Sequence, residues 1–70
     1  MNIGKVIYGF CNGYFGRDDY ETKRIEAEGA DWIVARPLDD LATPRFAHFD
    51  SELEKDNCLS EWTVKPKEFV

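Results

Sequence analysis

The chain has 70 residues, of which 43% are apolar and 33% are charged, and its formal net charge is −5. This length fits one small domain, and the apolar fraction argues against a globally disordered chain. No apolar run reaches the roughly 18 residues of a membrane span, and no signal peptide is visible. Two cysteines are too few for a disulfide scaffold, so we expect reduced thiols in a cytoplasm, with a Cys11–Cys58 bridge as the alternative.

The negative charge is concentrated in one segment. Residues 39–61 hold seven acidic and two basic side chains, so they account for the whole net charge. An acidic surface disfavours nucleic acid and anionic membranes as partners and favours basic protein surfaces.

The strongest turn signal is Asn12-Gly13, which lies between two aromatic arms. A two-residue hairpin loop needs positive φ at its central residues, and Asn-Gly supplies it most readily. The pattern predicts a strand over Ile3–Cys11 and a short strand over Tyr14–Arg17. A single long loop over residues 11–20 is the alternative.

The hairpin register sets which residues face each other across its two arms. Gly9 would face Gly16, and such a glycine pair leaves a gap in which a large side chain can pack. Trp32 and Trp62 are the natural candidates to fill it. Which face of the hairpin is buried then depends on whether either of them does so.

Three further strands are predicted in chain order. Thr22–Glu28 alternates, with Ile25 and Ala27 on one face beside Lys23, and Arg24, Glu26 and Glu28 on a wet face. Residues 28–31 supply the turn that follows, in which Gly29 is free to take positive φ. Asp31–Arg36 is apolar on both faces, which favours a central strand that ends at Pro37. After a loop that Leu38 and Leu41 should pin to the core, Arg45–Phe49 places Phe46 and His48 on one face and Ala47 and Phe49 on the other.

A helix is predicted from about Glu52 to Trp62. Ser51 and Glu54 form a capping box, with Ser51 as N-cap and Glu54 reaching back. Cys58, Leu59 and Trp62 cluster on one side of the helical wheel, whereas Leu53 does not join them. A later start near Asp56 is therefore the alternative. The domain should span residues 1–64, with residues 65–70 as a flexible tail.

These elements predict an α+β fold: a small, twisted antiparallel sheet or partly open barrel of about five strands, with one C-terminal helix. An SH3-like or chromodomain-like small barrel is one concrete form of this architecture. That comparison rests on the order of elements alone and implies nothing about activity.

The residues offer little support for catalysis, a metal or a cofactor. His48 and the two cysteines lack zinc-site spacing, and the aspartate pairs Asp18-Asp19 and Asp39-Asp40 are most simply solvated turn residues. His48 and Asp50 lie on one strand face, but Ser51 is better explained as a helix cap. The glycines fit no phosphate-binding loop. We therefore expect no enzyme activity, no cofactor and no metal.

Binding to another protein is the expected function, with the chain acting as a regulator, inhibitor or adaptor. The candidate surfaces are the acidic helix and the aromatic hairpin, because tyrosine and arginine are enriched at interface hot spots. The candidate binding residues are Tyr8, Phe10, Tyr14, Phe15, Arg17 and Tyr20. The alternative is a nucleic-acid-binding module that stacks bases on the same hairpin, which the acidic charge disfavours. A homodimer through strand edges is also open.

Overall fold

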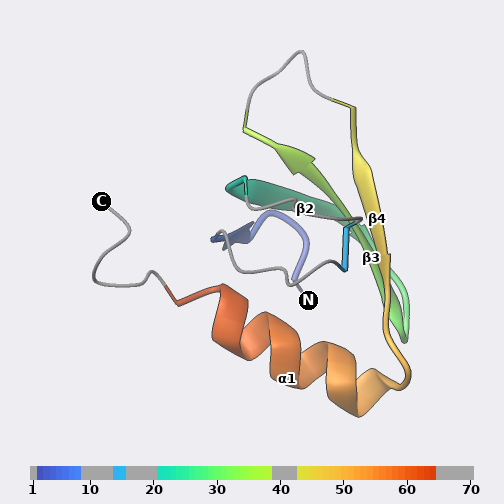
Figure 1. Ribbon diagram of the computed structural model, residues 1–70. Helices are drawn as coiled ribbons and strands as arrows, with labels where there is room; N and C mark the ends of the chain where they lie inside the picture. Colours follow the sequence, from blue (N-terminus) through green and yellow to red (C-terminus); the bar gives the residue numbers. More distant parts are fainter. Residues whose placement is uncertain (1, 9–13, 16–20, 39–42, 65–70) are drawn as a thin grey trace.

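The computed structural model describes residues 2–8, 14–15, 21–38 and 43–64. In this part of the chain, four antiparallel strands form one sheet in the order β1-β2-β3-β4, and one helix follows them (Figure 1). The strands are β1 (Val6–Ile7), β2 (Lys23–Glu28), β3 (Trp32–Pro37) and β4 (Arg45–His48), and the helix is α1 (Glu52–Trp62). The predicted α+β class is confirmed, with four strands in place of about five.

Strand β1 begins later than the predicted Ile3–Cys11 and ends at Ile7 in the described part of this segment, which stops at Tyr8; residues 9–11 lie outside the described residues. Residues 3–4 form a turn in which Lys5 N–H donates to Asn2 O at 3.0 Å and Gly4 takes a φ of 93°. Because positive φ is incompatible with an extended strand, regular pairing begins only at Val6. From there β1 pairs with β2, placing Val6 opposite Arg24.

The second predicted arm, Tyr14–Arg17, is described only at Tyr14 and Phe15. Tyr14 forms an isolated bridge and Phe15 lies in a turn. Phe15 is buried and Tyr14 is half-buried, and both rings lie near Trp62. The Asn12-Gly13 turn and the Gly9–Gly16 pair lie outside the described residues.

Strand β2 contains a β-bulge that reverses its side-chain alternation. Ile25 pairs with Ala35, but Ala27 pairs with Val34, so Glu26 is the extra residue. After the bulge Glu28 lies opposite buried Ile33 and faces the helix. The prediction that Glu28 shares the wet face with Arg24 and Glu26 is therefore wrong.

Strand β3 lies between β2 and β4, as predicted for a central strand. Ile33 and Ala35 point to the buried side of the sheet, and Ala47 lies opposite Ile33 on β4. The alternation predicted for residues 45–49 is also observed, because Ala47 and Phe49 are buried whereas Phe46 and His48 are exposed. Leu38 is 45% exposed, so it does not pin the following loop to the core.

Helix α1 begins at Glu52, and the alternative of a late start is wrong. The Ser51 hydroxyl accepts a hydrogen bond from Glu54 N–H at 3.1 Å, as an N-cap does. The Glu54 carboxylate does not complete the capping box, because it accepts a hydrogen bond from the Tyr14 hydroxyl. At the other end, Trp62 O accepts from Tyr8 N–H at 2.9 Å, which ties the end of the helix to the end of β1.

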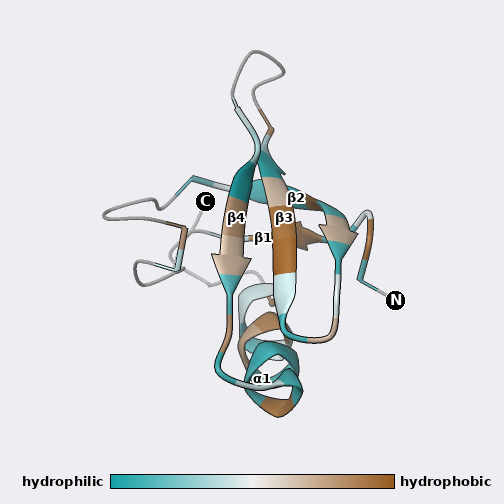
Figure 2. Cartoon of the chain, turned by 90° about the vertical axis from the view of Figure 1, so that its right-hand side faces the viewer, coloured by the Kyte–Doolittle hydropathy of each residue, from teal (hydrophilic) through white to brown (hydrophobic). Residues whose placement is uncertain are grey.

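The core lies between α1 and the inner side of the sheet. Figure 2 shows the sheet with β3 and β4 toward the reader and α1 below their ends. Trp62 is its centre, with Tyr14, Phe15 and Phe49 around it at ring-centroid distances of 5.4, 6.1 and 5.8 Å. The buried apolar residues are Ile7, Phe15, Ile25, Ile33, Ala35, Ala47, Phe49, Leu59 and Trp62.

Candidate functional site

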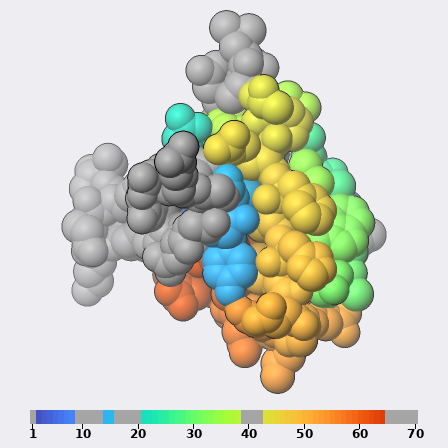
Figure 3. Space-filling view, turned by 45° about the vertical axis from the view of Figure 1, so that its right-hand side comes forward, coloured from blue at the N-terminus to red at the C-terminus, as the bar shows by residue number. Residues whose placement is uncertain are grey.

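The side of the sheet turned away from α1 carries a group of partly exposed apolar and aromatic residues. We call Trp32, Val34, Phe46 and His48 the aromatic sheet face. Strand alternation brings them together, since Trp32 pairs with His48 and Val34 pairs with Phe46. Figure 3 shows β4 and β3 side by side on the surface, in yellow and green, with residues 14–15 in blue along the other side of β4.

The three rings of this face form a row with similar orientations. The centroids of Trp32 and Phe46 lie 6.0 Å apart at an interplanar angle of 27°, and those of Phe46 and His48 lie 6.5 Å apart at 17°. Phe46 is 56% exposed although it is a large apolar side chain. Its stacked neighbours orient its ring, and its exposed area is available to a ligand.

Trp32 is held in place by the absence of a side chain at Gly29. A Cβ on Gly29 would lie 2.1 Å from Trp32 Nε1, so the indole occupies that space and lies over the strand end. The two residues are also joined by a hydrogen bond of 2.9 Å from Gly29 N–H to Trp32 O. Gly29 does not adopt the positive φ that was open to it. It is required because the indole fills the space of a side chain.

Charged residues lie at both ends of the aromatic sheet face. At one end His48 Nε2 lies 3.2 Å from Asp31 Oδ2, with both side chains well exposed. At the other end Arg36 Nε donates to Glu26 Oε2 at 3.0 Å. His48 therefore contacts Asp31, and not Asp50 as the sequence suggested. Phe49 N–H donates a hydrogen bond to Asp31 O at 2.7 Å, which places Asp31 beside the end of β4.

A second polar cluster joins Tyr14 to the helix. The Tyr14 hydroxyl donates to Glu54, and this hydrogen bond, together with burial, raises the pKa of Tyr14 far above its ordinary value. Burial also raises the pKa of the nearby Cys58 thiol, which is a free cysteine. A raised pKa keeps the thiol protonated at neutral pH, so Cys58 is a poor nucleophile.

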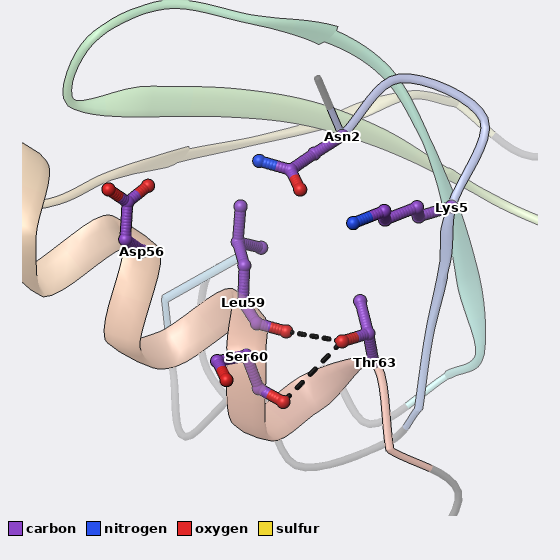
Figure 4. A pocket seen from close by; sticks show the side chains of 6 residues that line it. All are labelled: Asn2, Lys5, Asp56, Leu59, Ser60 and Thr63. Carbon is purple, nitrogen blue, oxygen red and sulfur yellow. Dashed lines mark hydrogen bonds between the residues drawn. The ribbon is translucent and has the colours of Figure 1, made fainter.

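A hollow of about 330 Å³ lies between the N-terminal turn and the second half of α1 (Figure 4). Five of its six lining residues are polar, and they do not act as one set. Thr63 Oγ1 donates to Leu59 O at 2.8 Å, and Asn2 donates to Glu28 through its N–H and its side-chain amide. The hollow is lined by Asn2, Lys5, Asp56, Leu59, Ser60 and Thr63. Most ligand pockets are lined largely by apolar groups, so this hollow is the weaker candidate site.

The residues predicted to bind a partner have different positions. Tyr8 is half-buried, Tyr14 is half-buried against Phe49 at 4.9 Å, and Phe15 is buried under the ammonium of Lys23. Phe10, Arg17 and Tyr20 lie outside the described residues. The sequence did place Phe46 and His48 on one strand face, but it did not mark that face as the exposed one. Trp32 was considered only as a core residue.

No protein-family model, curated protein or solved structure matches the chain. In the described ranges, no helix has the length and apolar character needed to cross a bilayer. The same ranges contain no group of three or more histidine, cysteine, aspartate or glutamate residues that could hold a metal ion.

Proposed function

We propose that the chain is a protein–protein interaction domain whose docking surface is the aromatic sheet face. The observation that carries this proposal is Phe46, which stacks between Trp32 and His48 and is still 56% exposed. Aromatic side chains contribute large contact area for little conformational entropy, and tryptophan in particular is enriched among interface hot spots. Covering the row of rings would release its hydration water, which favours association.

The charges around the face support a protein partner more than a nucleic acid. Arg36 and His48 already lie against Glu26 and Asp31, so phosphates would have to compete with these carboxylates. Binding to single strands usually relies on a cationic groove beside the stacking rings. The net charge of −5 opposes such binding further.

The proposed docking surface differs from the aromatic hairpin that the sequence suggested. Tyr14 and Phe15 pack against Trp62, so they contribute to the core. Binding through Phe10, Arg17 and Tyr20 stays a prediction, as does binding through the acidic side of α1, where Leu53 is 69% exposed. We also propose that the domain acts as a regulator, inhibitor or adaptor in the cytoplasm, without enzyme activity of its own.

Site-specific photocrosslinking in the source cell tests the proposed function. A benzoylphenylalanine at position 46 should give a discrete protein adduct, whereas the same group at the exposed helix position 57 should not. A crosslinker at exposed position 24 should give less adduct in the Phe46→Ala variant than in the chain that keeps Phe46. The melting temperatures of the two proteins should be the same. Absence of adducts at position 46, or adducts that nuclease treatment removes, would contradict the proposal.

A further inference from the structure

The two ends of the aromatic sheet face differ in charge. Asp31 lies at the end formed by Trp32 and His48. Asp50 and Glu52 come shortly after His48, the last residue of β4. Arg24 and Arg36 face each other at the opposite end, where Arg36 also pairs with Glu26. One end of the row of rings, at His48, therefore lies beside the partly exposed carboxylate of Asp31.

An aromatic ring and a carboxylate side by side attract the same kind of group. The face of a π-system attracts cations within about 6 Å of the ring centroid, and the carboxylate adds a charge-assisted hydrogen bond. An arginine guanidinium satisfies both, because it is planar, stacks on rings and donates in a fork. Asp31 has two carboxylate oxygens and 43% of its side chain is exposed, so it can accept from a ligand as well as from His48.

We propose that the aromatic sheet face recognises an arginine-bearing basic segment of a partner protein, with the guanidinium over Phe46 and Trp32 and hydrogen-bonded to Asp31. This inference rests on the proposed function and adds the chemistry of the partner to it. The net charge of −5 agrees with a basic partner, because an acidic domain attracts such a segment.

Titration of the ¹⁵N-labelled full chain with capped arginine peptides tests the inference. The probe is acetyl-Gly-Arg-Gly-Arg-Gly-amide, and the matched controls replace both arginines with citrulline, which keeps the shape without the charge, or with glutamate. We expect saturable shifts of the Trp32 indole N–H and of Phe46 and His48. The citrulline peptide should bind about tenfold more weakly, and the glutamate peptide should not bind.

Two variants separate the ring from the carboxylate. Phe46→Leu keeps an apolar side chain without a π-system and should weaken binding of the arginine peptide about threefold. Asp31→Asn keeps a hydrogen-bond acceptor for His48 without the charge and should weaken it by a similar factor. Val64→Ala, at an exposed residue just after α1, is the control and should leave the affinity unchanged.

Several results would overturn the inference. Equal binding of the citrulline peptide would show that charge is not recognised, and preferential binding of the glutamate peptide would identify Arg24 and Arg36 as the attractive groups. A lack of saturable shifts up to about 10 mM peptide would also overturn it. If position 46 still crosslinks to a protein in these cases, only the arginine chemistry fails. Saturable binding of an oligothymidylate at the same residues would reject both proposals.

Discussion

The Lys55 ammonium lies 3.3 Å from Glu28 Oε2 and donates to Gly29 O at 2.6 Å, joining the middle of α1 to the end of β2. Both side chains are mostly buried, and the second oxygen of Glu28 accepts from Asn2 N–H at 2.7 Å. The bulge at Glu26 makes this contact geometrically accessible, since without it Glu28 would point away from the helix. The pair therefore couples strand register to helix docking.

Glu28→Gln should destabilise the domain by about 1–3 kcal/mol, because it removes a charged acceptor from buried donors. The hydrogen bond from Asn2 N–H is the main cause that lowers the pKa of Glu28 in the folded state. A lowered folded pKa stabilises the protein above the unfolded value of 4.5, and this stabilisation is lost as pH falls through the folded pKa. Urea denaturation of both proteins between neutral and acid pH should show a smaller pH dependence for Glu28→Gln. Identical pH profiles would contradict this assignment.

Lys55→Met and Lys55→Ala separate the stem of this lysine from its charge. The alkyl stem extends the buried stripe of α1 that also contains Leu59 and Trp62, so Lys55→Ala should cost about 3 kcal/mol or more. Lys55→Met keeps most of the packing and should be less destabilising. Combining Lys55→Met with Glu28→Gln should cost less than the two single changes added together. Full additivity in this double-mutant cycle would show that the two side chains do not interact.

Gly29→Ala should destabilise the domain by about 1–3 kcal/mol, because the new methyl group would overlap the Trp32 indole. The displaced indole should also become more accessible to acrylamide, whereas buried Trp62 should stay protected. Trp32→Ala is the matched background, since it removes the clash. Gly29→Ala should be close to neutral there, and an undiminished loss of stability in that background would contradict the role given to the indole.

Ser51→Ala should cost about 1 kcal/mol, because the N–H of Glu54 loses its acceptor at the start of α1. Ser60→Ala is the control, because Ser60 is an exposed residue in the same helix and lies far from the cap. Alanine has the higher helix propensity, so this control should be neutral or slightly stabilising. Thermal unfolding followed by circular dichroism measures both. Equal effects at the two positions would argue against a capping role for Ser51.

Tyr14→Phe should cost about 1 kcal/mol by removing the hydrogen bond to Glu54 while keeping the ring against Phe49 and Trp62. The pKa of Tyr14 is higher in the folded state than its unfolded value of 10.0. The hydrogen bond therefore stabilises the fold fully below pH 10.0, and this stabilisation is lost as the pH rises through the folded pKa. The stability difference between wild type and Tyr14→Phe should therefore narrow in alkaline solution. Chemical denaturation at neutral and alkaline pH measures this difference. A difference that stays constant would contradict the assigned hydrogen bond.

Local signals predicted much of the fold. The residues from Ser51 to Trp62 carry a cap and an apolar cluster, and the helix bounds were predicted correctly. Strands β2 and β3 were also recognised, because their side-chain patterns and flanking turn residues are local features. The prediction that Pro37 cannot continue the ladder was wrong, since Pro37 is the last residue of β3 and pairs with Lys23. The start of strand β1 was predicted too early, because the residues around Gly4 were not recognised as a turn.

The candidate site was harder to predict because it depends on tertiary packing. Each face of residues 45–49 carries one phenylalanine, and only the docking of α1 decides that Phe49 is buried and Phe46 exposed. The bulge in β2 leaves no trace in the alternating pattern around Glu26. Lys55 was not recognised as a core residue, because its burial requires the partner Glu28, which the bulge reorients.

The hydrogen bond from Tyr8 N–H to Trp62 O has a consequence for synthesis on the ribosome. Trp62 is both the centre of the core and the acceptor for the end of β1, and it lies near the end of the helix. A nascent chain can form β2, β3 and β4 before this residue leaves the exit tunnel, but it cannot complete the core. Phe15 and Phe49 would then be exposed together until the last turn of the helix emerges. The domain should therefore reach its native state only after Trp62 has emerged, in one late step.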